Sequence, residues 1–172
     1  SYNAFMTKAG KEYAKRFLLR RKALYILDES QHIKTPGAKR TKSIVASGNY
    51  AAYKRICTGT MDDESPFDAY SQLKFLDPKF WQREGLGSAA AFRSYFGKYY
   101  TRAQATIDNG YDPGYDVLAG YQHLDVLGKL INTIGDRLTK EEAKINLPPQ
   151  LYSKRYFDLP PKHRRAYDEL DT

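Results

Sequence analysis

The sequence predicts an α/β fold for its first 78 residues and a mainly helical part after them. A short apolar run, residues 23–27, and a second candidate strand, residues 53–58, are separated by a basic stretch with helical character. This order of strand, helix and strand is typical of a right-handed parallel crossover, in which both strands end at one edge of a sheet. After residue 78 the apolar side chains recur mainly at helical spacing.

The first expected elements are an amphipathic helix and a buried strand. Residues 1–21 carry apolar side chains at helical intervals among lysines and arginines, which predicts a helix beside a sheet. Residues 23–27, Ala-Leu-Tyr-Ile-Leu, form a continuous apolar run, the pattern of a fully buried parallel strand. The carboxyl end of such a strand is where parallel sheets place their chemistry.

A basic helix and a second strand are expected next. The turn Lys34-Thr35-Pro36-Gly37 precedes residues 38–47, which predict a basic helix ending at Gly48 and Asn49. The second strand, residues 53–58, leads into Thr58-Gly59-Thr60. These small residues can lie close to phosphates or to carboxylates at the end of the first strand.

The remaining elements follow from apolar spacing and from helix breakers. Asp77-Pro78 ends one predicted helix, and Gly85 and Gly87 interrupt another aromatic-rich helical stretch. The predicted elements are helices over 66–75, 79–100 and 117–134, a loop over 108–115, a strand over 151–159 and a helix from 162 to 170.

Composition narrows the class of protein. The 172 residues are 41% hydrophobic, enough for a domain with its own core, and the net charge of +8 suggests an anionic partner such as nucleic acid. The single Cys57 excludes an internal disulfide and fits a reducing compartment. We find no apolar run typical of a signal peptide or membrane span, so we expect an intracellular protein, in the cytoplasm or associated with a nucleoid. The 15 tyrosines can fill a core or stack on bases.

An acidic pair, Asp28-Glu29, follows the first strand. One carboxylate can hold Mg²⁺, directly or through water, while its neighbour orients an attacking water, and this is the chemistry of nucleotide hydrolysis. The same pair can instead cap the following helix. A metal-dependent nuclease is a weaker interpretation, because no further cluster of carboxylates or histidines has metal-ligand spacing.

Four short motifs follow one another between residues 25 and 78. They are D-E-S-Q-H-I-K-T at 28–35, A-K-R-T-K at 38–42, T-G-T at 58–60 and P-F-D-A-Y-S-Q-L-K-F-L-D-P at 66–78. Together they resemble the Swi/Snf family of DNA-dependent ATPases in helicase superfamily two, nearest its annealing-helicase-like branch and that branch's phage and bacterial relatives. A weaker similarity, D-R-L-T-K-E-E followed by L-P-P, continues to about residue 159.

The resemblance implies a domain organisation. Residues 1–78 resemble the C-terminal half of a RecA-like parallel-sheet ATPase lobe, which is the first motor lobe of the family. Residues 79–135 resemble its helical protrusion, a mainly helical insertion, and residues 136–172 the return to the lobe and the start of the connection to the second lobe. The N-terminal half of the first lobe and the whole second lobe would then lie elsewhere. The first residue is not methionine, which also favours an excerpt of a longer protein.

The resemblance also implies roles for individual residues. Asp28 and Glu29 resemble the Walker B pair, Asp28 for the Mg²⁺ bound with ATP and Glu29 for the catalytic water. Gln31 resembles the residue that senses the nucleotide and couples to the third motif, whereas His32 falls at a variable position. The third motif, which links hydrolysis to DNA contact, corresponds to Thr58, Gly59 and Thr60. The candidates for DNA contact are Lys34, Lys39, Arg40, Lys42, Arg137 and Lys140.

Some basic residues have alternative roles, and the sequence departs from the family's usual residues at several positions. Lys34 can be a solvated turn lysine, and Lys39, Arg40 and Lys42 a solvated helix face. Met61 stands where the family usually has proline, and Glu64 where it usually has asparagine. The phosphate loop G-x-x-x-x-G-K-[ST] does not occur in the sequence, so we expect the chain alone to be inactive. The expected partner is double-stranded or branched DNA, and the alternative is a non-enzymatic DNA-binding or assembly module that retains the fold.

Overall fold

The computed structural model describes residues 1–59, 61, 65–101, 103, 114–136, 138, 142–144 and 151–168. The chain divides into two compact units, residues 1–135 and 136–172. All strands assigned among the described residues belong to the first unit. Within the described part of the chain, no helix is long and apolar enough to cross a bilayer.

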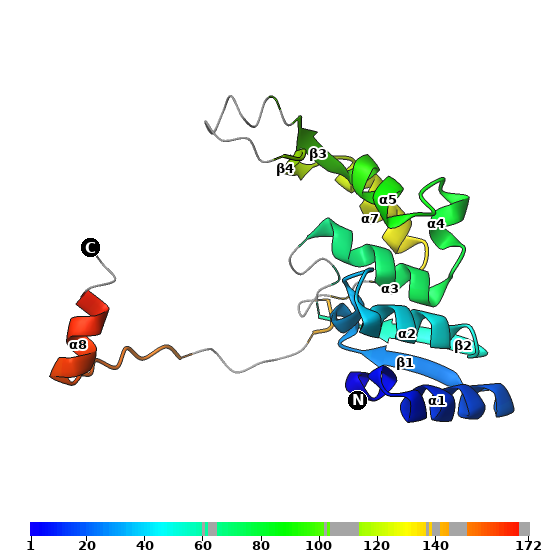
Figure 1. Ribbon diagram of the computed structural model, residues 1–172, viewed down its shortest axis with the longest axis horizontal. Coiled ribbons are helices and arrows are strands. Elements are labelled where there is room, and N and C mark those ends of the chain that lie inside the picture. Colours follow the sequence, from blue (N-terminus) through cyan, green and yellow to red (C-terminus); the bar gives the residue numbers. More distant parts are fainter. Residues whose placement is uncertain are drawn as a thin grey trace. The chain divides into compact units, whose positions relative to one another are not determined.

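A parallel strand pair organises the first half of the first unit. Strands β1 (Leu24–Asp28) and β2 (Tyr53–Cys57) pair in parallel, with Asp28 opposite Cys57. Helix α2 (Lys39–Gly48) lies between them in sequence and beside them in space (Figure 1). The predicted α/β fold and the parallel crossover are therefore confirmed, and both strands end at the same edge.

The prediction that β1 is buried on both faces is wrong. Leu27 is 5% exposed and packs with Ile44 and Phe75, whereas Leu24 and Ile26, which alternate with it, are 53% and 51% exposed. Because successive side chains of a strand point to opposite faces, one face of the β1–β2 pair covers a core and the other is open to solvent. A continuous apolar run does not reveal whether a second layer covers the strand.

The predicted N-terminal helix is present in two pieces. A short 3-10 helix, η1 (Tyr2–Met6), precedes helix α1 (Lys8–Arg20), and the Thr7 hydroxyl caps α1 by accepting a 3.0 Å hydrogen bond from the Gly10 N–H. A Cβ at Gly10 would lie 2.1 Å from the Ala4 carbonyl oxygen. Only glycine therefore allows η1 and α1 to approach this closely.

Helix α3 (Ala69–Leu76) joins two hydrophobic cores. Its Phe75 belongs to the core formed with β1 and α2, and its Tyr70 and Leu73 belong to a second, aromatic core. Figure 1 shows α3 between α2 and the layer of the later helices. Short helix η3 (Pro66–Asp68) precedes α3, and Asp77 ends it as predicted.

The later part of the first unit contains an antiparallel strand pair that the apolar spacing did not predict. Helices α4 (Phe80–Arg83), α5 (Ala89–Phe96) and α7 (Leu124–Asn132) surround the second core, but β3 (Gly97–Tyr100) and β4 (Val117–Tyr121) pair in antiparallel. The predicted helix over 117–134 is therefore wrong before residue 124, and the predicted helices over 79–100 end at residue 96. Spacing of Leu118, Tyr121 and Leu124 fits a helix, but pairing with a strand distant in sequence determines the outcome.

The second unit contains helix α8 (Pro161–Asp168), which confirms the predicted C-terminal helix. The strand predicted over 151–159 is not formed. Leu151 and Tyr156 are 93% and 89% exposed, so these residues have no buried face of the kind that stabilises a strand. The assignment of residues 1–78, 79–135 and 136–172 to lobe, protrusion and connection remains a prediction.

We expect Phe92→Ala to lower the free energy of unfolding by about 3–5 kcal/mol, because it opens a cavity in the aromatic core. Phe92 is fully buried, and its ring centroid lies 4.6 Å from Trp81 and 4.7 Å from Phe96. Urea denaturation followed by tryptophan fluorescence measures the change. The matched control is Tyr115→Ala, which truncates a ring that is 68% exposed and should change stability by about 0.5 kcal/mol or less. Equal losses in the two variants would contradict this description of the core.

Candidate functional site

The predicted acidic pair lies at the carboxyl end of β1. Asp28 is the last residue of the strand, and its Oδ1 accepts a 3.1 Å hydrogen bond from the Glu29 N–H. Glu29 has φ of 50°, in the left-handed region that L residues rarely adopt, and it leads into the short helix η2 (Ser30–Ile33). Such a conformation costs on the order of 1 kcal/mol and is typical of functional turns. Asp28 and Glu29 are both exposed to solvent.

Gln31 connects the acidic pair to the end of β2. Its Nε2 donates a 2.9 Å hydrogen bond to Glu29 Oε2, and its Oε1 accepts a 2.7 Å hydrogen bond from the Thr58 hydroxyl. The amide is therefore held from both ends. The structure brings Glu29, Gln31 and Thr58 together, and Gly59 follows as an exposed residue. Thr60, which was predicted to belong to the same motif, lies outside the described residues.

Tyr2 holds the backbone of the acidic turn. Its hydroxyl donates a short hydrogen bond to the Asp28 carbonyl oxygen and lies 3.4 Å from the Glu29 carbonyl oxygen. Burial, followed by the charges of Tyr25, Asp28 and Glu29, raises the pKa of Tyr2 to about 12. The phenol therefore remains a protonated donor at neutral pH. Sequence reasoning missed this residue because it precedes Asp28 by 26 positions and carries no motif.

Gln72 is a second residue that sequence reasoning missed. It is fully buried on α3, and its Oε1 accepts a 2.5 Å hydrogen bond from the Ser30 hydroxyl. Its Nε2 donates to the carbonyl oxygens of Met61, at 2.8 Å, and Asp68, at 3.0 Å. One amide thus links η2, the segment after T-G-T, and α3. A glutamine beside Leu73, in the interior of an apolar helix, was the signal available in the sequence.

The basic residues predicted to contact DNA differ in their exposure and in their ion pairing. Lys34 Nζ is 3.9 Å from Asp68 Oδ2, and these side chains are only 23% and 12% exposed. This arrangement favours a structural role for Lys34, and its predicted contact with DNA remains a prediction. Lys39 and Lys42 are exposed on α2, and Arg40 is half-buried.

Three further residues that the sequence pointed to lie outside the described part of the chain, and a fourth lies beside Tyr2. Arg137 and Lys140 lie outside the described residues, as does Glu64. His32 is exposed, and its ring meets that of Tyr2 edge-on at 5.0 Å.

Asp28 is suited to hold Mg²⁺ only with help from a ligand. Mg²⁺ usually takes one or two protein carboxylates and completes its shell with water and substrate phosphates. An exposed carboxylate at the end of β1 fits that pattern. Among the described residues, no group of three or more histidine, cysteine, aspartate or glutamate side chains could hold a metal ion.

We expect Gln72→Leu to lower the free energy of unfolding by about 2–4 kcal/mol, because it leaves buried polar groups of Ser30, Met61 and Asp68 without their partner. Ser30→Ala in the same background should show a coupling energy of about 1 kcal/mol in a double-mutant cycle measured by urea denaturation. Gln82→Leu, at an exposed position of α4, is the matched control and should change stability little. Strictly additive effects of the two substitutions would contradict the bridge.

Comparison with known proteins identifies relatives of this chain. No family model matches the sequence. The chain is 30% identical over 146 residues to an Arabidopsis thaliana SWI/SNF-related matrix-associated actin-dependent regulator of chromatin subfamily A member 3-like 1, covering 85% of the chain and 14% of the relative. It is 32% identical over 139 residues to the Mus musculus DNA annealing helicase and endonuclease ZRANB3, covering 79% and 12%.

Among solved structures, the Sulfolobus solfataricus SWI2/SNF2 ATPase core in complex with dsDNA matches with a TM-score of 0.46 and 25% identity, covering 90% of this chain and 30% of that one. The chain spans between 7% and 14% of the lengths of the curated relatives that it matches. The sequence relatives confirm the family that the motifs of residues 28–78 predicted: the chain is a homologue of Swi/Snf-family helicase-like proteins.

Proposed function

We propose that the chain supplies the hydrolytic half of an ATP site in a DNA-dependent motor that couples ATP hydrolysis to movement on DNA or to its remodelling. The observation that carries this proposal is the hydrogen-bonded series from Glu29 through Gln31 to Thr58. It joins an acidic pair at one strand end to a hydroxyl at the next strand end. A helix cap alone would not require this link between two strands.

In this proposal the two carboxylates have different tasks. Mg²⁺ and ATP, when bound, supply the transferable phosphoryl group and neutralise its charge. Asp28 would hold the ion, directly or through water, from the rigid end of β1. Glu29 would orient the attacking water from the left-handed turn that directly follows the strand. The N–H of Glu29 donates to Asp28 Oδ1, which limits the rotation of that carboxylate.

Gln31 would couple the site to DNA. Its amide contacts Glu29 through Nε2 and Thr58 through Oε1, so a shift of the Glu29 carboxylate alters the bond to Thr58. Thr58 begins the T-G-T motif, whose family role is to link hydrolysis to DNA contact. The amide is therefore suited to transmit the state of the nucleotide from one strand end to the other.

The phosphate cradle of the ATP site would come from outside these 172 residues. The sequence contains the acidic pair but no G-x-x-x-x-G-K-[ST], and residues equivalent to arginine fingers are expected from a second lobe. The small share of each relative that the chain spans supports the same view. We therefore expect no ATP hydrolysis by the chain alone.

Duplex or branched DNA is the proposed partner. The mouse relative is named a DNA annealing helicase, and this chain carries a net charge of +8. Positive charge of this size favours association with the phosphate backbone. Such a motor would act inside the cell, where DNA is present.

Glu29→Gln should lower DNA-stimulated ATP hydrolysis by a factor of about 100 or more in the longer protein that carries this segment together with a phosphate loop, because the amide cannot act as a base toward water. A coupled assay with and without duplex DNA measures the rate. The matched control is Glu84→Gln at an exposed glutamate after α4, which should leave the rate unchanged. Robust hydrolysis by the 172-residue chain alone would contradict the assigned roles, and absence of hydrolysis in every longer form would favour the non-enzymatic module.

Lys39→Gln and Lys42→Gln should each reduce the slope of log affinity against log salt by about 0.9, if each lysine contacts one phosphate of B-DNA. Fluorescence anisotropy with a labelled duplex at several KCl concentrations measures the slope. Lys129→Gln is the control with the same change in charge, because the Lys129 ammonium already lies 3.6 Å from an Asp125 carboxylate oxygen. An unchanged slope in the α2 variants would mean that these lysines form only a solvated helix face.

A further inference from the structure

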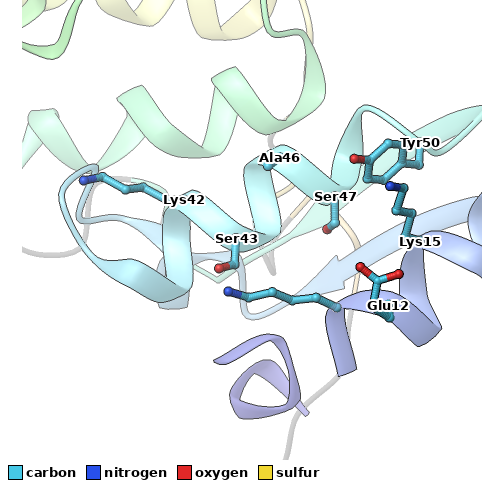
Figure 2. Close-up of a pocket in the computed structure, with 8 residues that line it drawn as sticks. Glu12, Lys15, Lys42, Ser43, Ala46, Ser47 and Tyr50 are labelled. Atoms are coloured by element: carbon cyan, nitrogen blue, oxygen red, sulfur yellow. The ribbon is translucent and has the colours of Figure 1, made fainter. Parts of the chain in front are cut away.

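A hollow between α1 and α2 is lined, apart from Lys42, by residues that the motifs do not include. Its volume is about 360 Å³, and it is lined by Lys11, Glu12 and Lys15 of α1 and by Lys42, Ser43 and Tyr50 on or after α2, among others. Figure 2 shows Glu12 and Lys15 on one side of this hollow, facing Ser47 and Tyr50 on the other. We call it the α1–α2 groove.

The α1–α2 groove has an excess of positive charge. Lys11, Lys15 and Lys42 line it together with one carboxylate, that of Glu12. Within the described part of the chain, none of these three lysines forms an ion pair. The Lys15 ammonium lies 5.5 Å from the centroid of the Tyr50 ring, a cation–π contact that restrains it at the groove while leaving its donors available.

The charge continues along both helices. Helix α1 contains five basic residues and one acidic residue, and α2 contains three basic residues and none that is acidic. On α1, Lys8, Lys11 and Lys15 recur at intervals of three and four, so they share one face. On α2, Lys39 and Lys42 are one turn apart. The groove therefore lies within an extended basic surface, and it is open rather than enclosed.

We infer that the α1–α2 groove binds the phosphate backbone of duplex DNA, with Lys11 and Lys15 as direct contacts. The inference rests on the proposed function, which makes duplex DNA the partner, and it adds a second helix to the basic residues of α2. Lysine ammonium groups on flexible side chains suit phosphodiester oxygens presented along a continuous strand. The half-buried Ser43 adds a hydroxyl donor at the same edge.

Glu12 provides a test in which the groove predicts stronger binding of DNA. Its carboxylate lies in the same groove and would repel a phosphate, so removing its charge should strengthen binding. A surface that attracted DNA only through the total charge of the chain would respond equally to any change of one charge. Binding in the groove, by contrast, predicts that the change in DNA affinity depends on where on the surface the altered charge lies.

The test measures binding of the 172-residue chain to a labelled duplex by fluorescence anisotropy at several KCl concentrations. The double substitution Lys11→Gln/Lys15→Gln should weaken binding about tenfold and reduce the salt slope by about 1.8. Glu12→Gln should tighten binding by about two- to threefold. The matched control is Lys98→Gln/Lys129→Gln, which removes the same charge from exposed positions of β3 and α7 and should have a much smaller effect. Circular dichroism verifies that each variant retains its helices.

Three outcomes would overturn the inference, and they differ in what they imply for the proposed function. If the double variant and its control weaken binding equally, the groove is not a DNA site, although DNA binding by the chain stands. If polyglutamate displaces the duplex at equal charge concentration, the groove takes acidic polymers in general and an acidic protein becomes the better partner. If the unchanged chain does not bind duplex DNA at low salt, both the groove and the DNA partner proposed for this segment fail.

Discussion

The parallel pairing of β1 with β2 is the constraint on which the candidate site depends. Because Asp28 lies opposite Cys57, the residues that follow each strand emerge at one edge and within reach of each other. The 2.7 Å hydrogen bond from Thr58 to Gln31 is a direct consequence of that register. A shift by one residue would turn the side chains of one strand to the opposite face and separate these groups. The site is therefore a property of strand alignment more than of any single loop.

The α3 helix extends the same constraint to the rest of the first unit. Gln72 fastens η2 and the segment after T-G-T to α3, and the neighbouring Tyr70 and Leu73 anchor α3 in the aromatic core. A buried amide with its hydrogen bonds satisfied is rigid, whereas a displaced one would leave polar groups without partners. Movement at the acidic turn is therefore mechanically connected to the aromatic core. The helices that follow residue 78 are thereby linked to the acidic turn.

Sequence patterns predicted the parts of this structure that depend on local periodicity. The strand, helix and strand of residues 24–57 and the proximity of Glu29, Gln31 and Thr58 follow from one apolar run, from the turn residues around it and from the geometry of parallel sheets. The β3–β4 pair was not predictable in this way, since Leu118 and Tyr121 also fit a helix and their partner strand is distant in sequence. Tyr2 and Gln72 were missed for a related reason. Their importance comes from tertiary hydrogen bonds that no short motif encodes.

The uncovered face of the β1–β2 pair and the incomplete ATP site have a common explanation under the proposed function. Leu24 and Ile26 expose about half of their surface, and the acidic pair beside them lacks a phosphate cradle in this sequence. In a parallel α/β lobe, further strands and helices would cover such a face and would also carry the phosphate loop at the same sheet edge. Burial of Leu24 and Ile26 and completion of the ATP site would then be one event. The stability of β1 and the capacity for hydrolysis would be linked through the same missing layer.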